Sequence, residues 1–185
     1  MSEELIEFAK HSHELTVDMK KSEEDNEPTV PVLVLAFEGA VFPCMMMGVT
    51  TGNLKDAAKK SIKHVKETVI PEVEAKEGKK IGKFLWFTIS SDTYIQRLSK
   101  ASEDETYEEA SKRRHEGFLG DHFKNGATDV YEALVTVACS PTEQIMITQI
   151  YRHTPVDGYE WEDPEIKMTS GQNVDPNWAF DIMDA

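Results

Sequence analysis

The densest group of potentially reactive side chains in this 185-residue chain is the stretch RRHEGFLGDHFKNG, residues 113–126. It holds two histidines, two acids and three glycines within fourteen positions. Imidazole and carboxylate groups can bind a divalent metal or transfer a proton. His115, Asp121 and His122 are therefore the candidate catalytic residues, and they would make the protein a small metal-dependent or acid–base hydrolase.

The same stretch also has a purely structural interpretation. The basic residues 112–115 suit the last turn of a helix, and Gly117 is typical of the position that follows a helix. Phe118, Leu119 and Phe123 are then expected to pack on the core, and Asn125-Gly126 to form a turn. We favour this interpretation, because every residue in the stretch then has a structural role.

The other candidate groups favour packing or solvation over chemistry. His11-Ser12-His13-Glu14 lies in a predicted helix, where residues two apart point in nearly opposite directions. We therefore expect this group to belong to the solvated helix face. Cys44 and Cys139 lie in apolar runs, which predicts buried, free thiols. The chain contains no phosphate-binding loop, dinucleotide fingerprint or zinc motif, so we expect neither a cofactor nor a metal.

Hydrophobic periodicity predicts helices that alternate with paired strands. The first predicted helix covers 3–24, with Leu5, Phe8, Leu15 and Met19 on one stripe. The clearest helix covers 52–70; its buried face is predicted to hold Leu54, Ala58, Ile62, Val65 and Val69. Pro71 is expected to kink or end it, and a further helix is predicted over 103–117.

Three doubled apolar segments follow the predicted helices. Residues 30–49 predict a hairpin in which Pro43 marks an edge strand or a bulge. Residues 83–98 predict two strands around a Ser-Ser-Asp turn, and 130–153 predict a hairpin that turns at Pro141-Thr142. Residues 158–163 add a further strand. The expected fold class is α+β, an antiparallel sheet with helices packed on one face, built from three helix–hairpin repeats.

Charge is concentrated at the two ends of the chain. Residues 1–28 carry nine acids and three bases, and residues 157–185 carry eight acids and one base, while the whole chain has a net charge of −14. Direct binding to nucleic acid is disfavoured, because phosphate affinity depends on accumulated Lys and Arg. The lysines of 55–66 are expected to form a solvated helix face.

The last segment differs from the rest. We expect a single domain over 1–163 and an acidic, aromatic tail over 164–185. Trp178, Phe180 and Ile182 alternate with small or polar residues, as in a strand that adds to a partner. They are the candidate partner-binding residues, although the same tail could fold back as an edge strand or lid on its own domain.

The expected function is that of a non-enzymatic accessory or adaptor protein, which acts by binding another protein and could also self-associate. The hydrolase is one alternative, and an acidic inhibitor that imitates nucleic acid is another. We expect a cytoplasmic protein with no membrane contact, because no apolar run is long enough to span a bilayer and the N-terminus does not resemble a signal peptide.

Overall fold

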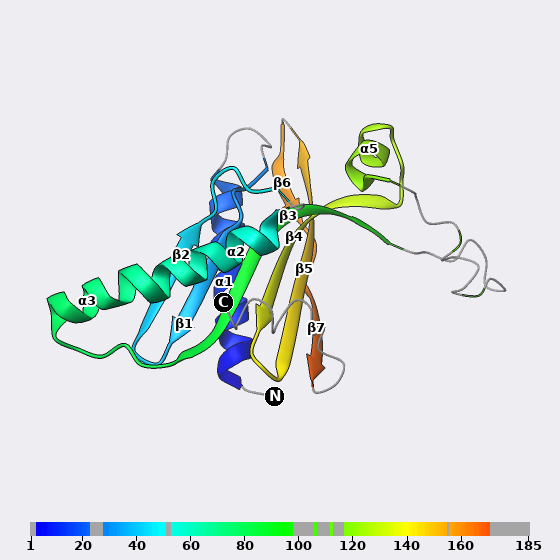
Figure 1. Ribbon diagram of the computed structural model, residues 1–185. Coiled ribbons are helices and arrows are strands. Elements are labelled where there is room, and N and C mark those ends of the chain that lie inside the picture. The colour runs from blue at the N-terminus through cyan, green and yellow to red at the C-terminus, as the bar shows by residue number, and fades with distance from the viewer. Residues whose placement is uncertain are drawn as a thin grey trace.

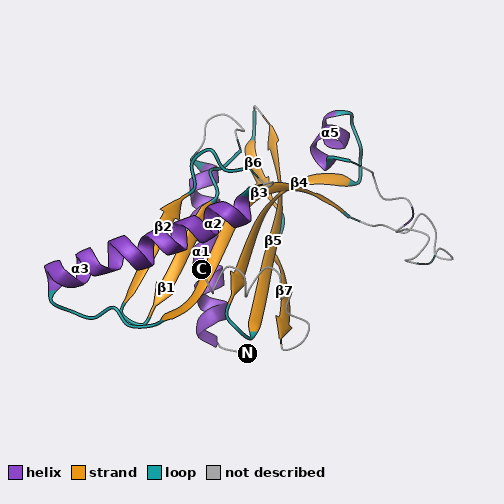
Figure 2. Cartoon of the chain, in the orientation of Figure 1, coloured by secondary structure: helices purple, strands orange, loops and turns teal. Residues whose placement is uncertain are grey.

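A computed structural model describes residues 3–22, 28–50, 53–97, 106, 112, 117–154 and 156–170. These residues form an α+β fold, in which a curled antiparallel sheet is flanked by helices (Figures 1 and 2). Within this described part of the chain, none of the helices combines the length and the apolar character that crossing a membrane requires.

The sheet has seven strands in the order β2-β1-β3-β4-β5-β6, and β7 also pairs with β5. Every pairing is antiparallel. β5 is long enough to hold β6 along its second half and β7 along its first half. The strands are β1 (Val32–Phe37), β2 (Ala40–Met45), β3 (Phe84–Gln96), β4 (Val130–Cys139), β5 (Glu143–Thr154), β6 (Gly158–Trp161) and β7 (Glu165–Ser170).

The helices cover both faces of the sheet, so the prediction of a single covered face is wrong. Phe87 of β3 is opposite Cys139 of β4, and both belong to the core cluster under α2 (Leu54–His64). Ala138, the residue before Cys139 on β4, packs instead against α1 (Glu3–Lys21). Successive residues of a strand point to opposite faces, so α1 and α2 lie on opposite sides, as Figure 1 shows.

The helix predicted over 52–70 is confirmed in its buried face, and it continues past Pro71. Leu54, Ala58, Ile62 and Val65 are buried over β1 and β3, and Val69 is partly buried. A π-helical turn, η1 (Val65–Val69), connects α2 to α3 (Ile70–Glu77). Proline lacks an N–H and clashes with the carbonyl four residues earlier; the wider π turn provides the room that lets the helix continue.

The three helix–hairpin repeats are not confirmed. Residues 84–96, predicted as two strands around Ser90-Ser91-Asp92, form the single strand β3, which pairs with β4 through all three of these residues. These polar residues look like a turn in the sequence, but two of them, Ser90 and Asp92, bond to polar groups of neighbouring elements. Tertiary contacts therefore override the local turn preference.

The remaining strands agree largely with the sequence. β2 is a terminal strand of the sheet, as Pro43 indicates, and β4 and β5 turn at residues 140–142. β6 adds to β5 as predicted. β7 was not predicted: it covers 165–170, the first part of the segment expected to be a tail. The helix predicted over 103–117 lies almost entirely outside the described residues.

Candidate functional site

The candidate catalytic residues are only partly placed. Asp121 and His122 lie next to each other on α5 (Leu119–Lys124), and His115 is outside the described residues. Adjacent residues of a helix point about 100° apart, and the side chain of Asp121 is exposed. Across the described ranges, no three His, Cys, Asp or Glu side chains are grouped closely enough to hold a metal ion. The hydrolase hypothesis stays untested, because it depends on His115.

The structural interpretation of residues 117–126 is correct in part. Phe123 packs on Tyr94 of β3, with their ring centroids 5.3 Å apart, and Asn125-Gly126 turns with a positive φ at Gly126. Gly120 lies so close to the Tyr94 ring that a Cβ atom would clash with it. Phe118, which was expected to pack on the core, is instead 82% exposed.

The buried face of α1 differs from the prediction, because it is largely polar. Leu5 and Ala9 are buried as in an ordinary amphipathic helix, but Leu15 is exposed. His13, predicted to be solvated, is buried, and Ser12, Thr16 and Lys20 are buried with it. The helix therefore presents polar groups to the sheet along most of its second half.

A chain of hydrogen bonds connects this polar face to the middle of the sheet. His13 contacts Thr136 of β4 through Nδ1 at 2.9 Å and Gln149 of β5 through Nε2 at 3.0 Å. The amide nitrogen of Gln149 donates to the carbonyl oxygen of Glu162, so the Gln149 amide oxygen accepts from His13. Nε2 then carries the proton, Thr136 donates to Nδ1, and Ser90 Oγ, 2.8 Å away, donates to Thr136.

His13 is held as a neutral imidazole by these hydrogen bonds. Burial lowers its pKa, although the hydrogen bond to Gln149 and the charge of Glu14 act in the opposite direction. Thr136, His13 and Gln149 are connected in the order hydroxyl, imidazole and orienting group that activated nucleophiles use. However, Thr136 is fully buried, so a substrate could not reach its hydroxyl. We therefore assign these hydrogen bonds a structural role.

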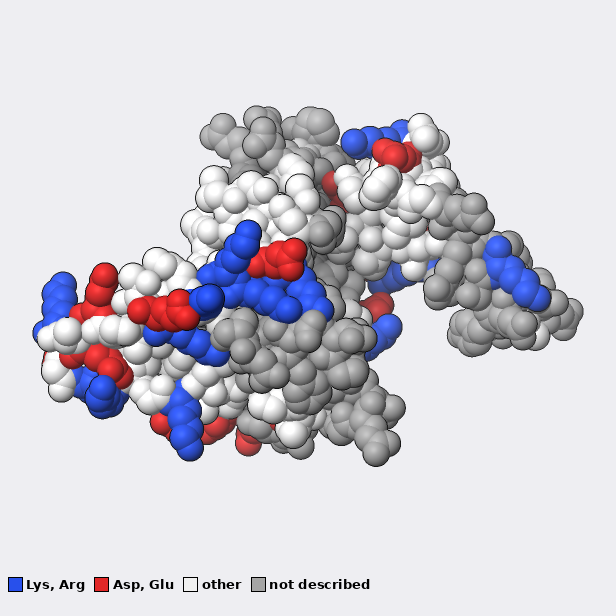
Figure 3. All heavy atoms as spheres, viewed as in Figure 1, with Lys and Arg blue, Asp and Glu red and all other residues white. Residues whose placement is uncertain are grey.

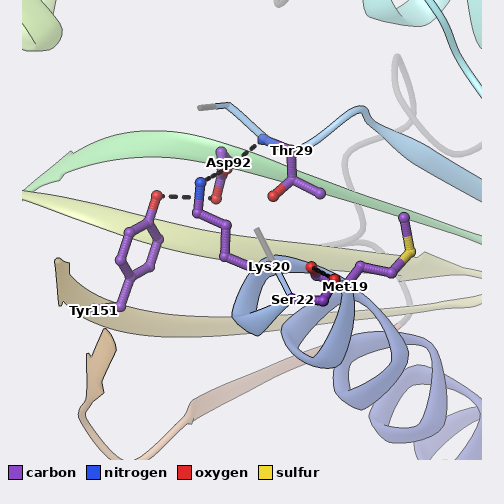
Figure 4. A network of polar contacts seen from close by, with 6 residues as sticks. All are labelled: Met19, Lys20, Ser22, Thr29, Asp92 and Tyr151. Carbon is purple, nitrogen blue, oxygen red and sulfur yellow. Dashed lines mark hydrogen bonds and ion pairs between the residues drawn. The ribbon is translucent and has the colours of Figure 1, made fainter. Parts of the chain in front are cut away.

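A buried ion pair lies at the C-terminal end of α1 (Figure 4). Lys20 is 0% exposed, and its Nζ is 3.1 Å from Oδ2 of Asp92 on β3. The backbone N–H of Thr29 donates to the same oxygen at 2.6 Å, and the hydroxyl of Tyr151 donates to Oδ1 at 3.2 Å. Asp92 thus joins the end of α1, the segment before β1, and strands β3 and β5.

Aromatic rings surround the Lys20 ammonium. Its Nζ lies 5.4 Å from the ring centroid of Tyr151 and 5.7 Å from that of Tyr159, distances typical of cation–π contacts. Burial, reinforced by the charges of Asp92 and Glu132, raises the pKa of Tyr151 far above its ordinary value. Tyr151 consequently remains a neutral donor, and the whole group is suited to fixing α1 in place rather than to exchanging protons.

The sequence carried a signal for this polar face. Ser12, Thr16 and Lys20 recur every four residues after Leu5 and Ala9, so they continue the same helical face. Thr136 and Gln149 each interrupt an apolar strand, and Asp92 lies in a short polar segment between two apolar ones. Buried polar residues need hydrogen-bond partners: Thr16 donates to the carbonyl oxygen of Ser12 within the helix, whereas Lys20 reaches Asp92 on the sheet, a partner that the sequence alone does not identify.

An exposed apolar surface lies on the other side of the sheet from α2, at strand β2. Val41, Pro43 and Met45 project from one face of β2, and Met47 follows. These four residues are the β2 surface. Val41 and Met45 are 55% and 58% exposed, whereas their partners on β1, Ala36 and Val32, are buried.

α1 borders this surface on one side. Phe8 of α1 packs on Trp86 of β3, with their ring centroids 6.1 Å apart, and Trp86 is opposite Ala36 of β1. Leu15 lies two helical turns after Phe8 on the same side of α1, and it is 44% exposed. The exposed flank of α1 and the β2 surface therefore face the same side of the molecule.

The remaining sequence features are placed as follows. Trp178, Phe180 and Ile182, the candidate partner-binding residues, lie outside the described residues. The lysines of α2 are exposed or half-buried, and Figure 3 shows them gathered along the helix with acidic side chains beside them. Cys44 and Cys139 are not joined in a disulfide and pack in the core cluster under α2, and burial raises the pKa of the Cys44 thiol.

No protein-family model, no curated protein and no solved structure matches the chain.

Proposed function

We propose that the protein is a non-enzymatic accessory protein, which binds another protein chain through the β2 surface. The observation that supports this proposal is that Val41, Met45 and Met47 are exposed, although β1, the strand next to β2, is buried along its whole length. Contiguous exposed apolar residues on a folded domain are typical of interaction sites. Methionine is common on such surfaces, because its flexible side chain adapts to different partner shapes.

The partner packs on the face of β2 instead of adding a strand to its edge. Pro43 lies in the middle of β2 and has no backbone N–H. It therefore cannot donate a hydrogen bond to a strand that paired with the edge of β2. Proline on an edge strand also discourages unwanted strand pairing. Side-chain contacts with Val41 and Met45 do not depend on the backbone.

Charge favours a basic partner over a second copy of this chain. The chain carries a net charge of −14, which opposes self-association. α1, beside the β2 surface, exposes five acids, Glu3, Glu4, Glu7, Glu14 and Asp18, against two exposed lysines, Lys10 and Lys21. These acids would speed encounter with a basic surface, and the apolar contacts would then hold the complex.

Site-specific photo-crosslinking tests this proposal. A photoreactive amino acid replaces Met45 in the full chain, and the cells that make the protein are irradiated. We expect one dominant cross-linked protein, which is then purified and tested for direct binding. Met45→Glu should weaken that binding at least about tenfold, because it places a charge in an apolar contact, and added salt should slow association.

Met168 of β7 provides the matched control. It is 53% exposed, close to the value for Met45, but it lies at the opposite end of the sheet. The photoreactive residue at position 168 and the Met168→Glu variant should leave the complex unaffected. Equal cross-linking from both positions, or cross-linking of position 45 only to a second copy of this chain, contradicts the proposal.

The tail provides a further, separable contact in this proposal. Trp178, Phe180 and Ile182 act as anchors on the same partner, and Trp178→Ala should weaken the complex on the order of 2 kcal/mol. Deletion of 171–185 with an unchanged melting temperature and weaker binding supports this role. A large fall in melting temperature would instead show that the tail belongs to the folded domain.

A further inference from the structure

The buried side chains that can carry a positive or negative charge lie on one helix. Among the described residues, His13 and Lys20 are the only His, Lys, Arg, Asp or Glu residues that are buried, and both belong to α1. They face Thr136, Gln149 and Asp92 on the sheet. A group that gains a charge inside a protein lowers the stability of its surroundings. The α1 side of the sheet is therefore the side that responds to pH.

The core cluster under α2 contrasts with this polar interface. Its described members are apolar, from Leu33 of β1 to Ile62 of α2 and Phe87 of β3, and the thiols of Cys44 and Cys139 are the only groups in it that ionise. Thiols are uncharged in acid. A fall in pH from neutral to mildly acidic therefore adds no charge to this core.

The helix α1 can leave the sheet without breaking a pair of strands. It packs on β3, β4 and β5, and the described strands form their ladder with one another alone. Leu5 and Ala9 of α1 pack with Ala138, Ile145 and Ile147 in a small cluster that is separate from the cluster under α2. Elements that are attached in this way can open locally while the rest of a protein stays folded.

The described surroundings of His13 disfavour a proton on its ring. Its nitrogens contact Thr136 of β4 and Gln149 of β5, which are uncharged, and Thr136 in turn contacts Ser90 of β3. A groove of about 430 Å³ beside the ring has two bases and two acids in its lining, all on α1: Lys10, Lys21, Glu14 and Asp18. The charge of Glu14 favours the proton, but burial has the larger effect and lowers the pKa of His13.

We propose that α1 is a pH-sensitive switch: protonation of His13 releases this helix from the sheet, while α2 and the strands stay folded. In the released helix His13 is exposed to water and takes up a proton at the ordinary pKa of 6.5. Docking is therefore complete above pH 6.5 and weakens as the pH falls from 6.5 to the docked-state pKa, by about tenfold for each pH unit in this interval. The inference concerns the free protein, so it does not depend on the proposed function.

Hydrogen exchange of the full chain, measured by mass spectrometry at about pH 7 and about pH 5, tests this switch on both sides of the ordinary histidine pKa. After correction for the intrinsic exchange rate, the amides of α1 should lose about tenfold in protection, and those of α2 and β4 should keep theirs. His13→Gln cannot take up a proton, so its α1 should be equally protected at both pH values. His11→Gln is the matched control, because His11 is exposed on the same helix, and it should behave like the unchanged protein.

A second variant keeps the test decisive if His13→Gln loosens α1 at both pH values. Gln149→Glu places a carboxylate where the Gln149 amide oxygen accepts from Nε2 of His13. A negative charge in hydrogen-bond contact with the imidazole favours its protonated form. We therefore expect α1 of this variant to keep its protection at about pH 5, where the unchanged protein loses it.

Three results would overturn the proposal. Equal protection of α1 at the two pH values in the unchanged protein would show that the helix is not released. An equal loss of protection in α1, α2 and β4 would show that acid unfolds the chain as a whole. A loss in α1 that is the same in the unchanged protein, in His13→Gln and in Gln149→Glu would show that a group other than His13 controls the helix.

Discussion

Neutralising Asp92 is expected to be far more damaging than the loss of a single ion pair at the surface. Lys20 is fully buried and the side chain of Asp92 is 10% exposed, so Asp92→Asn takes the carboxylate charge 3.1 Å from a buried ammonium out of the protein. Removing one partner of such a pair costs about 3–5 kcal/mol. Typical domains have about 5–15 kcal/mol of stability in total, so the variant should lose a large fraction of it.

Urea and thermal denaturation of the full chain measure this loss. For a chain of this length, each kcal/mol lowers the melting temperature by about 2–4 °C, so we expect a fall of roughly 6–20 °C. The double variant Lys20→Met with Asp92→Asn should be more stable than Asp92→Asn alone, because it also removes the buried ammonium. Glu7→Gln, which breaks an exposed pair with Lys10, is the control and should melt like the unchanged protein.

Two results would refute this reasoning. The first is a loss below about 1 kcal/mol in Asp92→Asn, the value expected of a solvated pair. The second is an additive double-mutant cycle, because two groups that interact directly must show a coupling energy. Either result would mean that Lys20 reaches water or another carboxylate, and that the end of α1 is held by its apolar contacts.

Three further predictions concern the rest of the described fold. The pKa of His13 is lowered in the folded state, so the unfolded chain binds a proton there more readily. The stability contributed by neutral His13 is therefore complete above pH 6.5 and is lost as the pH falls through the folded-state pKa. Urea midpoints measured at decreasing pH should show this loss in the unchanged protein and not in His13→Gln. Ile62→Ala, at a fully buried position under α2, should cost about 2–5 kcal/mol by urea denaturation, whereas Lys60→Ala on the exposed side should cost almost nothing. Cys44 and Cys139 should alkylate more slowly than glutathione at neutral pH, because Cys139 is buried and burial raises the pKa of Cys44; rapid labelling of the folded chain would contradict this.

Local pattern was sufficient to predict the elements whose buried residues are apolar. Helix α2 was predicted with its buried face because Leu54, Ala58 and Ile62 repeat at helical spacing, and the β4–β5 hairpin because Pro141-Thr142 separates two apolar runs. Pattern failed where buried residues are polar. Ser90 and Asp92 were interpreted as a turn, and His13 as solvated, because their partners are distant in sequence.

The candidate site shows the same division. Exposed Val41 and Met45 alternate with inward-facing residues, but both sets are apolar, so nothing in the sequence indicates which face of β2 is left uncovered. The contacts of Asp92 with Lys20 and Tyr151 depend on the register of β3, β4 and β5 and on where α1 ends. Register and helix docking are properties of the assembled sheet, so a single sequence does not specify them.

The docking of α1 by its polar face has a consequence for the order of events during synthesis. α1 precedes every other described element in the chain, but His13 bonds to residues 123 and 136 positions later. At about 5–20 residues per second, ribosomes need roughly 7–27 s to make the 136 residues between His13 and Gln149. Until the end of that interval the set of partners of the nascent helix is incomplete, because Gln149 is the last of Asp92, Thr136 and Gln149 to be made. The docking of α1 on the sheet must therefore be completed late, after β5 has been made.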